Sequence, residues 1–221
     1  MNLSKACIFD LDGVIVDTVS AHYTSWKTIA DELNIHFTEE ENERLKGVSR
    51  VESMQIILDI GGIILPDYRK ERLIAKKNER YVSIVSNMTK EDILPGVLES
   101  LALLKKYNIP CAIGSSSKNA TRILEAIGLT EKFYAIVDGK DIKNSKPDPE
   151  VFLLAAKKLN VSPNECVVIE DAYSGVKAAK RGGMYCIGIG KQEVLKEADV
   201  VISSMKEFSL SHLNIPDEKF R

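Results

Sequence analysis

The sequence contains few cysteines, and none of them form a C-x-x-C pair. The four are Cys7, Cys111, Cys166 and Cys186, and each lies in or beside a short apolar run. Zinc sites and disulfide frameworks need closer or paired spacings, whereas isolated cysteines in apolar runs are typical of buried, reduced thiols. The pattern therefore argues against a zinc centre and against a disulfide-stabilised fold.

Long hydrophobic runs and an excess of one charge are also missing. No apolar stretch approaches the roughly 20 residues of a membrane span, and the first apolar run breaks at Asp10, too early for a signal peptide. The net charge of -2 and the pI near 6.0 give no electrostatic reason to bind nucleic acid. We expect a soluble, cytoplasmic monomer with no membrane or nucleic-acid partner, and we interpret the lysine pairs at 76–77 and 157–158 as solvated helix faces.

The 221 residues are 44% hydrophobic and 28% charged, which is ordinary globular composition and enough to bury a core. Short, unalternated apolar runs recur along the chain with helical patterns between them. Such runs predict a parallel sheet buried on both faces, and hence a doubly wound α/β domain. The predicted strands are residues 6–9, 111–114, 135–137, 166–171, 186–190 and 200–202.

The segment between the first and second predicted strands has a different pattern. Apolar residues recur there at the i, i+3, i+4 and i+7 spacing of an amphipathic helix. They are Trp26, Ile29, Ala30 and Leu33. Further helical patterns lie around residues 54–58 and from 67 to about 86. We therefore predict an all-helical cap at residues 17–91, inserted into a core domain formed by residues 1–16 and 92–221.

Acidic residues follow two of the predicted strands. Asp10 and Asp12 come directly after the first, and Glu170 and Asp171 close another. Ligands of open α/β sheets bind at the carboxyl ends of strands. If these strands are neighbours, the four residues form an oxygen-rich cluster that suits Mg²⁺. The alternative is that these acidic residues cap helices or turns, where Asp is common. That alternative explains the four-residue cluster poorly. For Asp17 it explains the residue as well as a functional role does.

Two further stretches are candidate phosphate sites. The segment "GSSSKNAT" (114–121) ends a strand and opens a helix, whose free N–H groups bind phosphate. Serine and asparagine also cap helices generally, so this signal is weak alone. The segment "SKPDP" (145–149) holds Lys146 before a rigid proline turn, where a cation near an acidic cluster would neutralise phosphate oxygens.

Taken together, the motifs resemble those of the haloacid dehalogenase superfamily. They occur in the order "DLDGVIVDT", serines after the second strand, a lysine before proline, and "EDA". Within that superfamily, "KGVSR" (46–50), "SSSKN" (115–119) and "KPDP" are similar to the β-phosphoglucomutase family, and the similarity spans nearly the whole chain. The resemblance implies a core with strand order 3-2-1-4-5 and a helical cap, which makes the first and fourth strands neighbours.

The resemblance also implies roles for the carboxylates. Asp10 would be the nucleophile that forms an aspartyl-phosphate, and Asp12 would be the general acid and base. The Asp10 carboxylate, the Asp12 carbonyl and Asp171 would bind Mg²⁺, with Glu170 beside them or acting through water. The predicted metal site is therefore Asp10, Asp12, Glu170 and Asp171.

The same resemblance implies two phosphate sites. Ser115, the N–H of Ser116 and Lys146 would bind the transferring phosphoryl group, while Arg50 would hold a distal phosphate together with Ser117, Lys118 and Asn119. His22 and Lys77 would lie between cap and core; the alternatives are a helix-surface histidine and one more solvated lysine. Trp26 is interpreted as cap core rather than a sugar platform. The predicted phosphate- and substrate-binding residues are Thr18, His22, Lys46, Gly47, Val48, Ser49, Arg50, Lys77, Ser115, Ser116, Ser117, Lys118, Asn119 and Lys146.

Three functions remain open from the sequence. One is a Mg²⁺-dependent mutase that interconverts β-D-glucose 1-phosphate and D-glucose 6-phosphate through bound β-glucose 1,6-bisphosphate. A sugar-phosphate phosphatase would use the same Asp10 chemistry with water as acceptor. A phosphosugar-binding protein without turnover is disfavoured, because Asp10 and Asp12 are both present. Arg50 and Lys77 favour the mutase, since a distal phosphate needs cations that a broad phosphatase does not.

Overall fold

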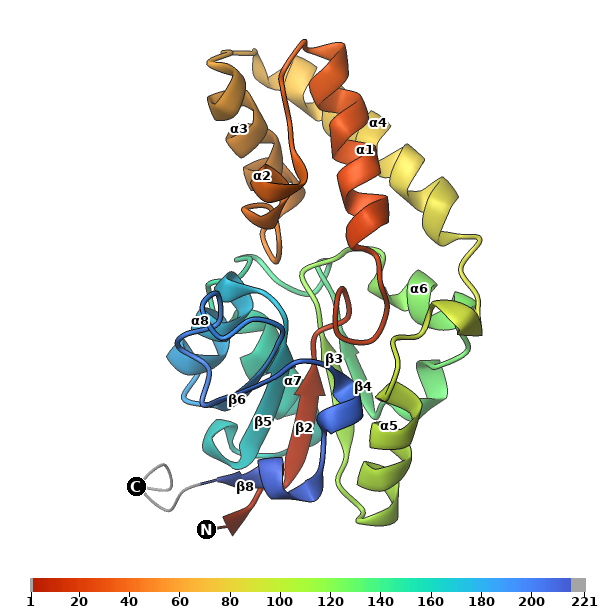
Figure 1. The fold of residues 1–221 in the computed structure, drawn as a ribbon, viewed down its shortest axis with the longest axis vertical. Helices are drawn as coiled ribbons and strands as arrows, with labels where there is room; N and C mark the ends of the chain where they lie inside the picture. Colours follow the sequence, from red (N-terminus) through yellow and green to blue (C-terminus); the bar gives the residue numbers. More distant parts are fainter. Residues whose placement is uncertain (1, 216–221) are drawn as a thin grey trace.

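The central element is a parallel sheet with a helical segment above it (Figure 1). The computed structural model describes residues 2–215; residues 1 and 216–221 of the predicted core domain lie outside the described residues. Within the described part, six strands run in the order β4-β3-β2-β5-β6-β7. They are β2 (Ala6–Phe9), β3 (Cys111–Gly114), β4 (Ala135–Val137), β5 (Cys166–Glu170), β6 (Tyr185–Ile189) and β7 (Val200–Ile202). The predicted fold class and strand order are confirmed, with β7 added at one edge.

The register of β2 determines which residues lie together at the carboxyl ends of the strands. Phe9 pairs with Ile113 on one side and with Ile169 on the other. The residues that follow Phe9 and Ile169 are therefore neighbours, and the backbone N–H of Asp10 donates to the carbonyl of Ile169 at 2.9 Å. Parallel pairing thus brings two acidic motifs, far apart in the sequence, to one point.

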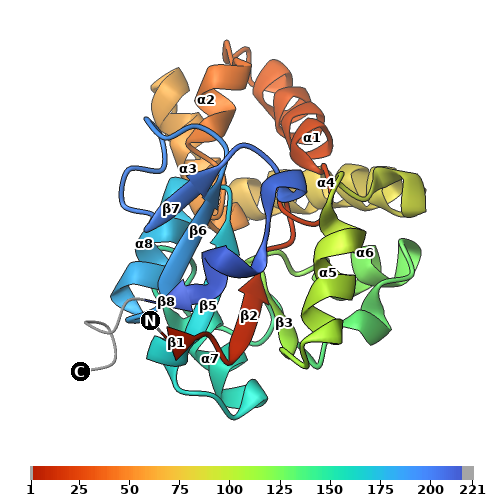
Figure 2. The same ribbon diagram turned by 60° about the horizontal axis from the view of Figure 1, so that its bottom comes forward.

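Helices cover both faces of the sheet (Figure 2). The helices α5 (Val97–Lys106) and α6 (Ala120–Ala126) pack on one face, and α7 (Glu150–Leu159) and α8 (Tyr173–Arg181) on the other. Successive side chains of a strand point to opposite faces, so Cys7 and Phe9 join the first apolar cluster while Ile8 joins the second. Burial on both faces explains why the strand sequences show no polar alternation.

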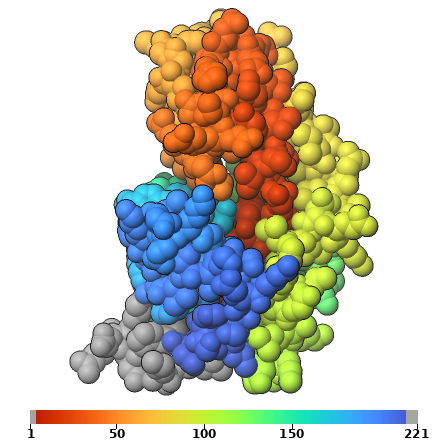
Figure 3. Space-filling model, in the orientation of Figure 1, coloured from red at the N-terminus to blue at the C-terminus, as the bar shows by residue number. Residues whose placement is uncertain are grey.

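The segment between β2 and β3 is helical. Its helices are α1 (Val19–Glu32), α2 (Glu39–Glu43), α3 (Arg50–Gly61) and α4 (Asp67–Val85). Ser49 caps α3 in a reciprocal capping box with Glu52, and Gly62 ends the helix with a φ of 62°. These helices share an apolar cluster of their own around Trp26, and they form an upper lobe in the space-filling view (Figure 3). The boundaries of the predicted domains stay a prediction.

Several details differ from the sequence-based expectations. Strand β5 ends at Glu170, so Asp171 lies just outside it, and β6 begins and ends one residue earlier than predicted. Helices α2 and α5 were not predicted, nor was the short antiparallel pair of β1 (Asn2–Leu3) and β8 (Asn214–Ile215). The four cysteines are buried and unpaired, as expected. No helix within residues 2–215 is both long enough and apolar enough to cross a membrane.

Candidate active site

A cavity of about 470 Å³ lies between the helical segment and the carboxyl ends of the strands. This size is typical of small-molecule sites. All the predicted site residues line it except Lys146, which lies beneath it. The predicted residues that line the cavity are Asp10, Asp12, Thr18, His22, Lys46, Gly47, Val48, Ser49, Arg50, Lys77, Ser115, Ser116, Ser117, Lys118, Asn119, Glu170 and Asp171.

Lys146 joins the two acidic strand ends. Its ammonium lies 2.5 Å from Asp10 Oδ1 and 2.7 Å from Glu170 Oε1, and its side chain is 0% exposed. The other oxygen of Glu170 accepts a hydrogen bond from the N–H of Ala172 at 2.6 Å. Gly175 makes room for this carboxylate, because a Cβ there would lie 1.7 Å from Glu170 Oε1. Both oxygens of Glu170 therefore have partners, and its role as a metal ligand stays a prediction.

The cluster carries more negative charge than one lysine can balance. Burial raises the pKa of Asp10 well above its usual value, although Lys146 opposes the shift. Neighbouring carboxylates raise it further; they are Glu170, Asp12 and Asp171. The Asp10 and Glu170 carboxylates outweigh burial at Lys146 and raise its pKa, so this lysine stays protonated. Burial and Glu170 raise the pKa of Asp171 to about 7.

The donor chemistry of the cluster fits Mg²⁺. Oxygen ligands at high negative charge are what this ion prefers. Within the described part of the chain, no three His, Cys, Asp or Glu side chains form a group that could hold a metal. The predicted metal site of Asp10, Asp12, Glu170 and Asp171 combines the carboxylates of Asp10 and Asp171 with the main-chain carbonyl of Asp12, and places Glu170 beside them or behind a water, so it stays a prediction. Gly13 has a φ of 83°, and a Cβ there would lie 2.2 Å from Asp171 Oδ2, so only glycine lets this loop approach Asp171 so closely.

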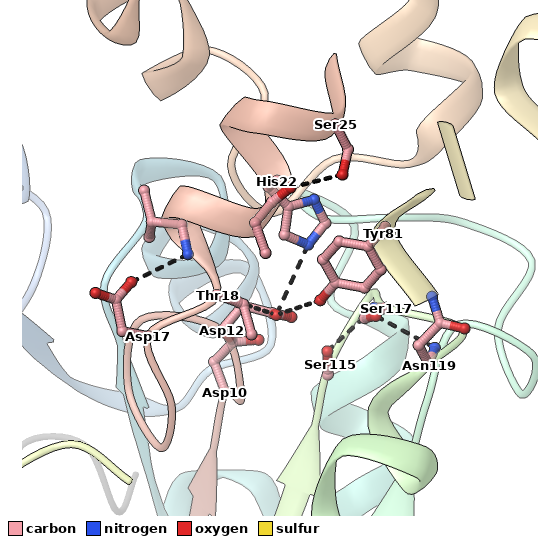
Figure 4. Close-up of polar contacts among 12 residues, drawn as sticks. Asp10, Asp12, Asp17, Thr18, His22, Ser25, Tyr81, Ser115, Ser117 and Asn119 are labelled. Carbon is pink, nitrogen blue, oxygen red and sulfur yellow. Dashed lines mark hydrogen bonds and ion pairs between the residues drawn. The ribbon is translucent and has the colours of Figure 1, made fainter. Parts of the chain in front are cut away.

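Asp12 is held by side chains of the helical segment (Figure 4). The hydroxyl of Thr18 donates to Asp12 Oδ1, the Tyr81 hydroxyl lies 3.3 Å from the same oxygen, and His22 Nε2 lies 3.8 Å away. Burial alone would raise the pKa of Asp12, but His22 and Thr18 hold it below its usual value. Asp12 is therefore a carboxylate at neutral pH, ready to accept a proton.

The position of Lys77 corrects the interpretation of residues 76–77 as a solvated helix face, and it rules out the alternative that Lys77 is one more solvated lysine. The lysine pair at 76–77 is not a solvated face, because Lys77 is 1% exposed whereas Lys76 is at the surface. The Lys77 ammonium lies 3.0 Å from His22 Nδ1 and over the ring of Tyr81, 4.5 Å from its centre. Burial lowers the pKa of Lys77 to about 7. One turn of α4 separates Lys77 and Tyr81, and that i, i+4 spacing could have placed Tyr81 in the site from the sequence.

The segment after β3 forms a compact turn with few free groups. The N–H of Ser117 donates to Ser115 Oγ at 3.1 Å, and the N–H of Asn119 donates to Ser117 Oγ at 3.2 Å. The Asn119 amide also reaches the helical segment, where it donates to Asn78 Oδ1 at 3.1 Å. The hydroxyl of Ser116 is buried without a partner within residues 2–215, which leaves it available to a ligand.

The loop between α2 and α3 forms the opposite wall. Lys46 lies 3.0 Å from Glu43 and 3.6 Å from Asp171 of the core. Arg50 begins α3 and lines the cavity, as do Gly47 and Val48. The cavity therefore has a carboxylate wall in the core and a cationic wall in the helical segment.

Some lining residues were not predicted. Asn42, Ser53 and Lys143 also line the cavity, and no motif distinguished them in the sequence; Ser145 lines it too and opens the "SKPDP" motif, in which only Lys146 was given a role. Trp26 belongs to the apolar cluster of the helices, as expected, and one side of it also lines the cavity. Asp17 is exposed and accepts a hydrogen bond from the N–H of Val19 at 3.1 Å, which favours a role at the start of α1.

Comparisons with known proteins agree with this fold. The family model for haloacid dehalogenase-like hydrolases matches residues 7–189. The chain therefore belongs to the haloacid dehalogenase-like hydrolase family. Within this family, the chain groups with enzymes that are phosphotransferases or phosphatases.

Individual relatives narrow the comparison. The β-phosphoglucomutase of Bacillus subtilis (strain 168) is 42% identical over 219 residues, which cover 98% of this chain and 97% of the relative. The "phosphorylated carbohydrates phosphatase" of Thermotoga maritima is 34% identical over 184 residues, covering 81% and 82%. The crystal structure of β-phosphoglucomutase from Clostridium difficile matches with a TM-score of 0.91 at 40% identity, covering 99% and 97%.

Proposed function

We propose that this protein is a mutase that interconverts β-D-glucose 1-phosphate and D-glucose 6-phosphate through an aspartyl-phosphate enzyme and bound β-glucose 1,6-bisphosphate. The observation that carries the proposal is the two-sided charge of the cavity. A carboxylate nucleophile site lies on one wall and Arg50, Lys46 and Lys77 lie on the other. A sugar with a phosphate at each end matches this arrangement.

The chemistry would begin at the core wall. A carboxylate oxygen of Asp10 attacks the phosphorus of the bisphosphate, and the bond from that phosphorus to the sugar oxygen breaks. Asp12 gives the leaving oxygen the proton that it took from the sugar hydroxyl in the other half of the cycle. In the return direction Asp12 accepts the proton of the attacking sugar hydroxyl; the lowered pKa keeps Asp12 ionised, so that it has room for this proton. The sugar oxygen takes the phosphoryl group and frees Asp10.

Lys146 and the main chain would stabilise the transferring group. The ammonium of Lys146 stays charged beside Asp10, and phosphoryl transfer depends mainly on such positioning and charge stabilisation. A bound Mg²⁺, held by Asp10, Asp171 and the Asp12 carbonyl, would neutralise phosphate oxygens. The hydroxyl of Ser116, which is buried without a partner within the described chain, would offer another hydrogen bond.

The cationic wall would hold the distal phosphate. The Arg50 guanidinium is suited to bidentate phosphate binding. Because the two phosphates of the sugar exchange places in a mutase cycle, this wall must accept either end of the substrate. Asn119 lies where the two walls meet, in contact with Asn78, and would bind the phosphate from the core side.

A phosphatase acting on sugar phosphates is the second candidate. The Thermotoga maritima relative carries that function in its name, and the Asp10 chemistry is the same with water as the acceptor. The two functions differ in what takes the phosphoryl group from Asp10.

The decisive experiment supplies β-glucose 1-phosphate, Mg²⁺ and a trace of β-glucose 1,6-bisphosphate, and follows glucose 6-phosphate and free phosphate separately. We expect glucose 6-phosphate to form much faster than free phosphate, and removal of Mg²⁺ with a chelator to stop the reaction. Rapid release of free phosphate with little isomer would reject the mutase and support the phosphatase.

A further inference from the structure

The loop that carries Lys46 of the cationic wall and leads into Arg50 lies against the first turn of α8. This loop is residues 44–49, between α2 and α3, and it contains Lys46 and Gly47. The hydroxyl of Ser174 in α8 donates a hydrogen bond to the carbonyl of Lys46 at 2.9 Å. Ser174 and Lys46 are 128 positions apart in the sequence, so only the tertiary structure brings them together.

Gly47 allows this close approach. Its φ is 73°, and a Cβ at this position would lie 2.3 Å from Ser174 Oγ. The same Cβ would be only in ordinary contact with the next nearest atoms, at 3.6 Å from the Cβ of Ser174 and 3.7 Å from that of Ala172. The backbone of the loop therefore fits closely against one hydroxyl group.

The contact links the two walls of the cavity. Ser174 lies three residues after Asp171, at the beginning of the helix that follows β5. On the other side, the Lys46 ammonium lies 3.6 Å from Asp171, and Arg50 begins α3 just beyond the loop. Ser174 is not among the described residues that line the cavity, so its hydroxyl acts through the loop.

We propose that Ser174 is a positioning residue, which docks the loop 44–49 on α8 and so holds the cationic wall over the carboxylates. The docked loop sets the distance between the phosphate sites and limits the entry of water to the phosphorylated nucleophile. This inference rests on the proposed function in one respect, because it assumes that the substrate carries a phosphate on the cap side.

The docking contact is tested with Ser174→Ala, and Ser83→Ala is the matched control. The hydroxyl of Ser83 donates to a carbonyl of its own helix at 2.8 Å on the exposed side of α4, so the control loses a similar hydrogen bond away from the cavity. A net hydrogen bond changes an equilibrium constant by about two- to tenfold. In Ser174→Ala we expect amide hydrogen exchange of residues 44–49 to accelerate by that factor.

The kinetic readouts separate positioning from a general structural role. For Ser174→Ala, the KM for β-glucose 1-phosphate should rise by about two- to tenfold, and a larger fraction of turnovers should end in free phosphate. The kcat/KM for p-nitrophenyl phosphate, which has no distal phosphate, should stay within about twofold of the wild type. If exchange, KM and product fraction in Ser174→Ala all match those of Ser83→Ala, the proposal is overturned.

A second pair of variants tests the contact from the loop side. Gly47→Ala should displace the loop and raise the KM more than Ser174→Ala does, because the new Cβ overlaps the hydroxyl. In the double variant that overlap is gone, so Gly47→Ala with Ser174→Ala should recover part of the loss seen in Gly47→Ala alone. Strictly additive losses would contradict a direct contact.

The assays also keep this inference distinct from the proposed function. If the wild-type protein forms free phosphate and no glucose 6-phosphate, the mutase proposal fails. The docking contact is then judged by hydrogen exchange of residues 44–49 and by the KM for sugar-phosphate hydrolysis, where the same changes are expected. Unchanged values in both would overturn it.

Discussion

Two buried lysines show how differently the core and the helical segment treat charge. Lys146 of the core and Lys77 of α4 are both inaccessible, at 0% and 1% exposed. Lys146 binds two carboxylates, and its pKa is raised. Lys77 has a histidine nitrogen and aromatic rings around it, and burial lowers its pKa to about 7.

The difference follows from the work that each wall would do. The core must hold several carboxylates close together without substrate, and a permanent cation offsets their repulsion. In the proposed function, Lys77 has no carboxylate partner within residues 2–215 so that it can pair with a phosphate that binds and leaves. A buried cation without a partner is costly. Binding of a phosphate beside it would remove that cost, which would add to the free energy of binding.

The largest effect is expected from removal of the proposed nucleophile, Asp10. Asp10→Asn keeps the size of the side chain but cannot form the aspartyl-phosphate, so turnover should fall by at least about 10³-fold. Both glucose 6-phosphate formation and p-nitrophenyl phosphate hydrolysis should be lost, since both depend on the core wall. Thermal unfolding serves as the control for folding. Substantial residual activity in either assay would contradict the aspartyl-phosphate chemistry.

The next effect concerns stability. Lys146→Met leaves Asp10 and Glu170 buried without their cation, and breaking a buried pair in this way costs about 3–5 kcal/mol. Urea unfolding near pH 7 measures it. Lys77→Met is the matched control: it removes an equally buried ammonium that has no carboxylate partner within residues 2–215, and it should not destabilise the protein. Equal losses in the two variants would show that the two lysines do not differ as described.

A smaller and selective effect is expected on the cationic wall. Arg50→Ala should lower kcat/KM for β-glucose 1-phosphate by about 10- to 100-fold, the equivalent of one or two charge-assisted hydrogen bonds. Hydrolysis of p-nitrophenyl phosphate should change little, because that substrate reaches only the core wall. The control is Arg44→Ala, which removes an exposed arginine at the first position of the loop 44–49 and should affect neither substrate. Parallel losses on both substrates in Arg50→Ala would remove the argument for a distal phosphate.

The smallest effect is a pH dependence of stability from Lys77. Its pKa is about 7 in the folded protein and 10.5 as a free side chain. Between these values the unfolded chain holds a proton that the folded chain has released. The free energy of unfolding should therefore rise with pH in this window, by at most about 1.4 kcal/mol per pH unit, and this contribution should be constant below it. Urea unfolding at pH 7, 8 and 9 should show this rise in the wild type relative to Lys77→Met, and parallel curves would contradict the lowered pKa.

Much of the fold follows from local patterns in the sequence. Short apolar runs predicted the strands of the sheet to within a residue at their ends, because burial on both faces leaves no room for polar side chains. The helical periodicity around Trp26 predicted α1 for a similar reason. The pair β1–β8 was missed, since each strand has two residues and too little pattern to detect.

The candidate site also has a part that the sequence predicted and a part that it did not. The acidic motifs predicted a carboxylate cluster on the condition that their strands are neighbours, since parallel strands bring their carboxyl ends to one edge. The family resemblance supplied that adjacency and the role of Lys146. The sequence did not show that Lys146 lies beneath the cavity between Asp10 and Glu170, nor that Tyr81 reaches Asp12. The Lys146 contacts depend on packing within the core, and the Tyr81 contact depends on how the helical segment sits on the core.

The sequence by itself thus determined the sheet, the family resemblance and the residues at the strand ends, because these depend on local periodicity and on short motifs. Only the tertiary structure decided that Lys77 is buried rather than solvated, and that Ser174 meets the carbonyl of Lys46 across the cavity's edge. The physical reason is that both outcomes depend on the packing of two separate elements. A side chain's burial and partners are set by what lies opposite it, and neighbouring residues in the sequence do not carry that information.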